Sequence, residues 1–169
     1  MNTVIIEIDG QDKVGKDVLH RYIEQLSNYK YIINSRGILT QLVYSDKFKR
    51  PYEYELTYKP FVVLLTADHR DLEIRCRINN EPKCNFEKDE YAFNYYADLL
   101  MNKGVAVVRY NTSKMTMLQI AEQVLRLYER YIENTSLLLE PLKLSTADIY
   151  DADDLKDEDV FYGGLTCDA

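Results

Sequence analysis

A loop framed by two glycines near the N-terminus is the part of the sequence with the clearest chemistry. Gly10–Asp17 (GQDKVGKD) fits the pattern G-x-x-x-x-G-K and directly follows the apolar run Val4–Asp9. Glycines allow backbone N–H groups to wrap around a phosphate, and the N-terminus of a following helix adds partial positive charge. The lysine of such a loop, here Lys16, neutralises the β- and γ-phosphates of a nucleotide. A glycine turn before an amphipathic helix is the alternative, and the strand–loop–helix context favours the phosphate-binding loop.

The residue after Lys16 departs from the usual pattern. A serine or threonine normally gives its hydroxyl to Mg²⁺ at this position, whereas this chain has Asp17. A carboxylate also binds Mg²⁺, but it repels phosphate at short range. We therefore take Asp17 as the candidate metal ligand, with either a different metal geometry or weaker nucleotide binding as the consequence. A first-turn acid favoured by the helix dipole is the alternative.

Short apolar runs alternate with helical patterns up to about residue 136, and this alternation predicts an α/β fold with three layers, α/β/α. We expect a short parallel sheet of about four strands, because buried parallel strands read as continuous apolar runs. The expected strands are Val4–Asp9, Tyr29–Asn34, Phe61–Thr66 and Val105–Tyr110. The expected helices cover residues 18–26, 38–48, 68–78, 86–103 and 116–128, and residues 51–60 are expected to be an irregular connection. Gly104 is expected to end one helix, and Thr116 with Gln119 to cap another.

The stretch IEIDGQDKVGKD resembles the P-loop of thymidylate kinases and related deoxynucleoside and deoxynucleotide kinases. Asp12 matches the acidic residue that those loops carry two positions after the first glycine. A GK-Asp ending also occurs in some kinase P-loops, including that of a phage deoxynucleotide kinase. The resemblance implies the nucleotide-kinase-like form of the P-loop NTPase fold, with ATP bound along the loop. The implied ATP ligands in the loop are Gly10, Gln11, Asp12, Lys13, Val14, Gly15, Lys16 and Asp17.

A second stretch agrees with this resemblance. Residues 31–45 (YIINSRGILTQLVYS) resemble the strand and Asp-Arg motif of thymidylate kinases, followed by a small hydroxyl residue and a helix. Arg36 falls on the phosphate-binding arginine of that family and Thr40 on the hydroxyl. Ser35 falls where the family has an aspartate that serves the metal and the acceptor. We therefore hypothesise a paired exchange relative to that family, in which the carboxylate is lost at Ser35 and gained at Asp17.

The resemblance continues weakly to about residue 132. Residues 60–82 resemble a strand, a helix and an arginine-rich lid, which makes Arg75 and Arg77 candidate ATP ligands and leaves Arg70 as a further candidate. A solvated helix face is the alternative for each arginine. The family has a further strand and two helices before the Asp-Arg motif, and only residues 27–30 stand there in this chain. The acceptor pocket is therefore truncated or built differently, with Tyr52, Tyr54 and Tyr58 either stacking on a base or packing as a connection.

Two functions of different class follow. The first is ATP-dependent phosphoryl transfer to a deoxynucleotide or nucleoside, with ATP and Mg²⁺ as cofactors and Lys16, Arg36 and Asp12 as catalytic residues. Asp9 is the alternative to Asp12 for positioning the acceptor hydroxyl. The second is a degenerate kinase fold that acts as a binding, regulatory or structural protein, since both metal-side positions are altered and the acceptor region is short. A homodimer or a protein partner is open in both cases.

Charge is distributed unevenly along the chain. Residues 137–169 carry nine acidic and two basic side chains, which accounts for the whole net charge of −7. We therefore expect a P-loop kinase-like domain at residues 1–136 and an acidic C-terminal tail at 137–169, of which Leu137–Leu144 could pack back onto the domain. The electrically neutral body argues against a nucleic-acid groove.

The lack of targeting signals favours the cytoplasm, or the host cytoplasm if the protein is viral. No apolar stretch approaches the roughly 18 residues of a membrane span, and the N-terminus lacks the pattern of a signal peptide. Cys76, Cys84 and Cys167 are an odd number without paired spacing, which favours a reducing compartment.

Overall fold

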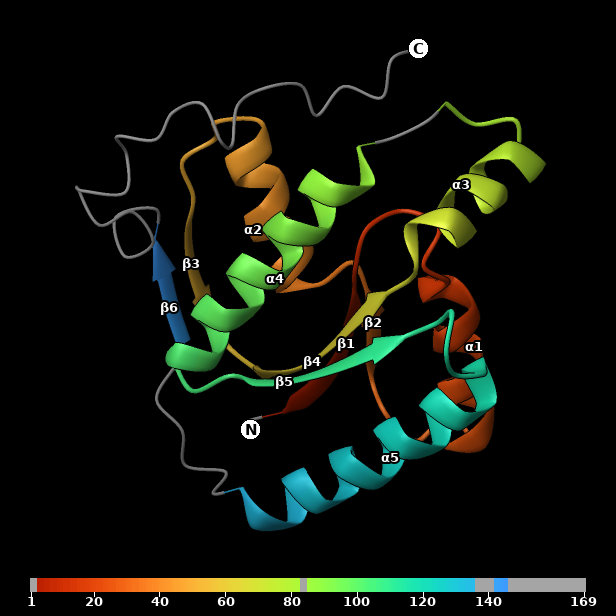
Figure 1. Cartoon of the computed structure of the whole chain (residues 1–169). Coiled ribbons are helices and arrows are strands. Elements are labelled where there is room, and N and C mark those ends of the chain that lie inside the picture. Colours follow the sequence, from red (N-terminus) through yellow and green to blue (C-terminus); the bar gives the residue numbers. More distant parts are fainter. Residues whose placement is uncertain (1–2, 83–84, 136–141, 146–169) are drawn as a thin grey trace.

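The computed structural model describes residues 3–82, 85–135 and 142–145 (Figure 1). This part of the chain contains five helices and six strands. The helices are α1 (Lys16–Leu26), α2 (Ile38–Lys47), α3 (His69–Ile78), α4 (Phe86–Asn102) and α5 (Met117–Asn134). The strands are β1 (Val4–Asp9), β2 (Ile33–Ser35), β3 (Glu53–Leu56), β4 (Lys59–Thr66), β5 (Ala106–Asn111) and β6 (Leu142–Ser145).

Four strands form a parallel sheet in the order β2-β1-β4-β5. In the central strand β1, Ile6 lies opposite Ile33 of β2 on one side and Phe61 of β4 on the other. Helices α1 and α5 cover one face of the sheet, and α2 and α4 cover the other (Figure 1). The predicted three-layer α/β fold with a short parallel sheet is therefore confirmed. Because the strands are parallel, their carboxyl ends meet at one edge, where the connecting loops gather functional side chains.

Each face of the sheet has its own apolar core. Ile6 and Ile8 of β1 pack with Leu19 and Ile23 of α1 and with Val124 of α5. On the opposite face, residues of α2 and α4 pack on β4; this second core contains Leu39, Leu42, Val62, Leu64, Phe93, Tyr96 and Leu100. The alternation of side chains along a strand sends successive residues of β4 into different cores, Val63 into the first and Val62 and Leu64 into the second.

The boundaries of most elements agree with the sequence, and two expectations are wrong. The predicted strand at Tyr29–Asn34 is reduced to Ile33–Ser35, because Asn28 and Tyr29 adopt left-handed backbone angles with φ of 55° and 57°. The connection 51–60 is not irregular, since β3 pairs antiparallel with β6 and β4 already begins at Lys59. The pairing supports the expectation that part of Leu137–Leu144 packs back onto the domain. The rest of the acidic tail lies outside the described residues.

The expected helix boundary signals are also present. Gly104 follows α4 with a φ of 83°, in the left-handed region that ends many helices. Thr116 and Gln119 form the complete capping box at the start of α5. No helix in the described ranges is long and apolar enough to cross a membrane.

Candidate functional site

The glycine loop joins the carboxyl end of β1 to the N-terminus of α1, as the motif predicts. Three of its residues have positive φ: Gly10 at 147°, Lys13 at 68° and Gly15 at 101°. A Cβ at Gly10 would lie 2.4 Å from the carbonyl oxygen of Leu65, so the loop passes against β4 where no side chain fits. This tight path bends the loop around the first turn of α1, whose free N–H groups and dipole favour an anion.

Lys16 extends its amine into this loop. Its Nζ donates hydrogen bonds to the carbonyl oxygens of Gly10 and Gln11, each at 2.7 Å. Burial lowers the pKa of Lys16, whereas the nearby carboxylates of Asp12, Asp9 and Asp17 raise it. An amine held by two loop carbonyls is placed to exchange them for phosphate oxygens.

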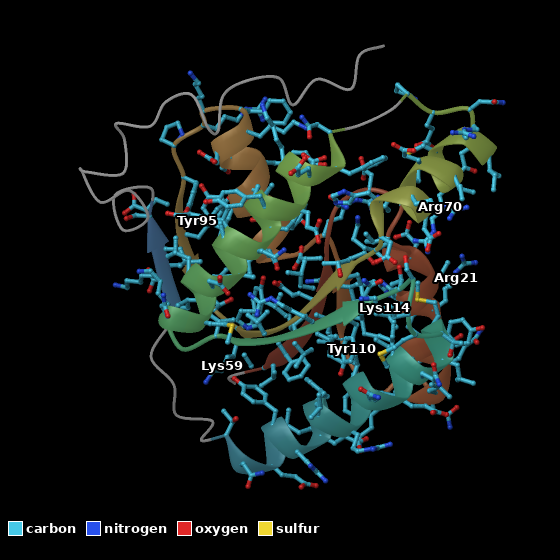
Figure 2. All side chains as sticks on the ribbon, in the orientation of Figure 1. Arg21, Lys59, Arg70, Tyr95, Tyr110 and Lys114 are labelled. Carbon is cyan, nitrogen blue, oxygen red and sulfur yellow. The ribbon has the colours of Figure 1, made fainter. Side chains whose placement is uncertain are left out.

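The arginines of α3 divide into different environments. Arg75 Nη1 donates to the carbonyl oxygen of Lys13 at 2.7 Å and to Thr112 Oγ1 at 3.2 Å, so it ties α3 and the β5–α5 connection to the loop. Arg77 is exposed and lines a hollow with Glu73, Cys76 and Glu81, and Glu81 pairs with Lys13 of the loop. Figure 2 shows the third arginine, Arg70, on α3 at the same end of the molecule as Arg21 of α1 and Lys114 after β5. Nucleotide contacts by Arg75 and Arg77 stay predictions.

The β2–α2 turn carries the other predicted basic residue, Arg36. Its backbone is left-handed, with a φ of 64°, and its N–H donates to the carbonyl oxygen of Ile8 at 2.9 Å. Its Nη1 lies 3.9 Å from Asp17 Oδ1, and its charge lowers the pKa of Lys16. Ser35 shares a hydrogen bond of 2.9 Å with Nδ1 of His20. The structure thus brings Arg36, Asp17 and Lys16 to one place.

Two carboxylates of β1 are buried beneath this turn. Glu7 and Asp9 are each 0% exposed, and both accept hydrogen bonds from the first turn of α2. Glu7 Oε2 accepts from the Ile38 N–H at 2.8 Å, and Asp9 Oδ1 accepts from the Thr40 N–H at 3.0 Å and the Thr40 hydroxyl at 2.5 Å. Burial raises the pKa of both carboxyl groups, that of Glu7 to about 7. The N-terminal end of α2 is therefore bound directly to β1 by two acids.

Several buried polar atoms next to the loop have no partner within the described residues. They are Asp9 Oδ2 and both amide atoms of Gln11, whose residue is 4% exposed. Buried polar atoms normally find partners, so unmatched ones beside a phosphate-type loop are candidates for ligand contacts. The charge of Lys16 acts favourably on Asp9 and lowers its pKa. The loop thus has both a cation and an unmatched carboxylate oxygen.

The remaining predicted residues are distributed around the loop. Asp12 is exposed within it. Asp89 of α4 is half-buried, and burial raises its pKa; Lys47 of α2 lowers that pKa and Asp12 raises it. These effects show that Asp89 lies within electrostatic range of Asp12 in the loop and of Lys47 at the end of α2. The tyrosine run packs rather than stacking on an open surface: Tyr52 and Tyr54 stack on each other at 5.2 Å, and Tyr58 donates to Glu7.

Glu7 is the residue that sequence reasoning missed. It stands within an apolar run and is read there as part of a strand. The signal that could have found it is the alternation of β1: Glu7 and Asp9 are two positions apart and so share a face of the sheet.

Comparison with known proteins agrees with this fold. No family model matches the chain. The uncharacterised SPbeta prophage-derived protein YorR of Bacillus subtilis (strain 168) is 24% identical over 127 residues, which cover 69% of this chain and 77% of YorR. A crystal structure of YorR in complex with phosphorylated GDP matches with a TM-score of 0.57 and 17% identity, over 78% of this chain and 99% of that one. At these identities the likeness establishes a shared fold.

Proposed function

We propose that this protein transfers a phosphoryl group from ATP to a nucleotide or nucleoside. The observation that carries the proposal is the pairing of Lys16, held by the loop carbonyls, with the unmatched Oδ2 of Asp9 behind the same loop. The nucleotide in the crystal structure of YorR supports a nucleotide ligand for the shared fold.

The loop would bind the phosphates of ATP. Its backbone N–H groups and the N-terminus of α1 supply partial positive charge, and Lys16 supplies a full charge. Asp17 suits a Mg²⁺ ion, because its carboxylate is exposed at the first turn of α1 and close enough to affect the pKa of Lys16. Mg²⁺ would neutralise charge on the phosphates when it is bound.

Arg36 would stabilise the charge of the transferred group. Its guanidinium lies on the Asp17 side of the loop, and phosphoryl transfer depends mainly on positioning and electrostatic stabilisation. The 3.9 Å separation between Arg36 and Asp17 also supports the paired exchange. In that hypothesis Asp17 carries the carboxylate that the resembling kinases have at the position of Ser35. Asp17→Ser should therefore lower turnover, and a rise would contradict the exchange.

Asp9 would bind the acceptor hydroxyl. Its Oδ1 accepts two hydrogen bonds from Thr40, whereas its Oδ2 has no hydrogen-bond partner within the described residues and could accept a proton. As the acceptor oxygen bonds to the γ-phosphorus, the bond from that phosphorus to the bridging oxygen breaks and the hydroxyl proton passes to the carboxylate. Burial raises the pKa of Asp9, which improves it as a proton acceptor. Asp12, exposed in the loop, is the alternative residue for this role.

A nucleotide-binding protein without turnover is the second candidate. The observation that favours this candidate is the hydrogen bond between Ser35 and His20. Ser35 stands at the position where the kinases that the chain resembles have an aspartate, and here its hydroxyl is bonded to a histidine. Such a protein would bind ATP through Lys16 but would leave its γ-phosphate intact.

A transfer assay separates the two candidates. Purified protein with Mg²⁺ and ATP labelled at the γ-phosphate is mixed with pooled nucleosides and nucleoside monophosphates, and labelled products are separated by chromatography. The proposal predicts a labelled nucleotide product, lost in Lys16→Ala and strongly reduced in Asp9→Asn. Lys30→Ala, an exposed lysine beyond α1, is the charge-matched control and should keep activity. Retained ATP binding without any labelled product would favour the second candidate.

A further inference from the structure

Glu7 makes a set of contacts that phosphate binding alone does not explain. Its side chain is buried in the middle of β1, where Tyr58 donates to Oε1 at 2.5 Å and the Ile38 N–H donates to Oε2 at 2.8 Å. Both carboxylate oxygens are thus hydrogen-bonded, one to the β3–β4 turn and one to α2. Burying a carboxylate costs free energy even when it is hydrogen-bonded, so a buried glutamate with these contacts is a candidate for a functional role.

Glu7 also lies directly beneath the turn that carries Arg36. A Cβ at Gly37 would lie 2.4 Å from Cδ and Oε2 of Glu7, so the turn approaches the carboxylate as closely as a residue without a side chain permits. Arg36 itself has a φ of 64°, a conformation that a non-glycine residue keeps only when its surroundings fix it. These surroundings include the Ile8 carbonyl, which accepts from Arg36, and the carboxylates of Glu7 and Asp9, which accept from Ile38 and Gly37.

Resting on the proposed function, we propose that Glu7 is a positioning residue, which fixes the Ser35–Ile38 turn from below and so holds Arg36 beside Lys16 and Asp17. Glu7 does not touch the nucleotide. It acts through Gly37 and Ile38 on the backbone of Arg36, and Tyr58 orients its carboxylate. A shift of the turn would move the guanidinium away from the phosphates without changing the loop.

Protonation of Glu7 should make its effect on the Ser35–Ile38 turn measurable. Burial raises the pKa of Glu7 to about 7, Tyr58 and the Ile38 amide lower it, and Asp9 raises it. Two further titratable groups contact the same turn: His20 of α1 bonds to Ser35, and Asp9 of β1 accepts hydrogen bonds from Gly37 and Thr40. A pH-dependent change in the turn therefore comes from Glu7 only if it survives the replacement of His20 and is lost in Glu7→Gln, which leaves Asp9 in place.

The first experiment observes the turn directly by NMR. Backbone amide shifts of Arg36, Gly37 and Ile38 are followed from pH 5.5 to 8.5 in the unmodified chain and in His20→Asn. The three amides should titrate together in both proteins, with a midpoint near the pKa of about 7 expected for Glu7. In Glu7→Gln the titration should disappear, and in Tyr58→Phe its midpoint should rise because a bond that favours the charged form is lost.

The chain offers a matched control. Tyr31 donates to Oε1 of Glu129 at 2.9 Å, which repeats the tyrosine–glutamate contact of Tyr58 and Glu7 at an exposed place. Glu129→Gln should leave the titration of the turn unchanged. Amides that do not titrate together, or that titrate equally in Glu7→Gln, would overturn the positioning role.

The second experiment tests whether Glu7 acts through Arg36. Glu7→Leu should weaken Mg²⁺–ATP binding or transfer by roughly tenfold, the size expected for one misplaced charged hydrogen bond. In an Arg36→Ala background, Glu7→Leu should add nothing further. Additive losses would contradict the proposal.

The two experiments also separate the two claims. Absence of ATP binding by the unmodified protein would reject the proposed function, while the NMR titration still decides the role of Glu7. If Glu7→Leu does not fold, Glu7→Gln replaces it, with the loss of the pH dependence of binding as the readout.

Discussion

The two faces of strand β1 carry different kinds of side chain, apolar on one and acidic on the other. Ile6 and Ile8 enter the core beneath α1 and α5, whereas Glu7 and Asp9 face α2 and bind the first turn of that helix. The first face contributes apolar burial. The second holds two acids without any exposed surface, and burial raises the pKa of each. One strand thus stabilises the fold on one face and positions the predicted phosphate-binding groups on the other, at a cost in stability.

Removing apolar volume from the α1–α5 face should give the largest change in stability. Ile6→Ala should lower the free energy of unfolding by roughly 2–5 kcal/mol, because it leaves a cavity in a fully buried core. Urea denaturation measures this loss, and ATP titration under folding conditions should give an unchanged affinity. A large loss of affinity would show that the two faces are not separate in function.

Removing the charge from the other face should change the pH dependence of stability. The pKa of Glu7 is raised from 4.5 to about 7 in the folded chain, so the folded state keeps a proton that the unfolded state has lost between these values. Stability should therefore fall by roughly 3 kcal/mol as pH rises through this window and then level off.

Urea denaturation of Glu7→Gln from pH 4 to 8 tests this effect. The fall should be much smaller in this variant than in the unmodified protein, and Glu129→Gln should follow the unmodified protein. Equal slopes for Glu7→Gln and the unmodified protein would contradict the assignment.

On the α2 face, we expect that adding a side chain at Gly37 destabilises the fold. Gly37→Ala should cost roughly 1–3 kcal/mol, since the new methyl group would overlap the carboxyl of Glu7. Glu7→Ala in the same chain should recover part of that loss. Gly104→Ala adds the same methyl group where nothing lies within 4 Å, so its cost reports only the strain of its positive φ of 83°. Thermal denaturation of these four proteins decides whether the contact is as close as described.

The helix cap on the α1–α5 face should give the smallest effect. Thr116→Ala removes one half of the capping box of α5 and should cost about 1 kcal/mol. Because α5 and α2 pack on opposite faces of the sheet, the NMR titration of Arg36, Gly37 and Ile38 should not move. A shifted midpoint would reveal coupling between the faces.

The sequence predicts the parts of this molecule that depend on local pattern. The glycine loop after β1, the order of strands and helices, and the capping box of α5 all follow from short-range spacing. The antiparallel pair β3–β6 could not be predicted, because its two strands are distant in sequence and each is short. Residues 29–32 have strand-forming composition, but the left-handed backbone of Asn28 and Tyr29 delays β2.

The candidate site was predicted only in part for the same reason. Lys16, Asp17 and Arg36 lie together, and local motifs had marked each of them. The environment of Glu7 depends on Tyr58 and on the first turn of α2, which only the fold brings to β1. The sequence around a glutamate in an apolar run does not indicate which residues will cover that glutamate in the fold.

Isothermal titration of ATP, with and without Mg²⁺, tests the phosphate-binding role of the loop most directly. The titrated proteins are the unmodified chain, Lys16→Ala and the control Lys30→Ala. We expect Mg²⁺-dependent binding that Lys16→Ala loses and Lys30→Ala keeps, because the Lys16 amine is held where the loop would surround a phosphate. No binding by the unmodified protein, or equal binding by Lys16→Ala, would contradict the account.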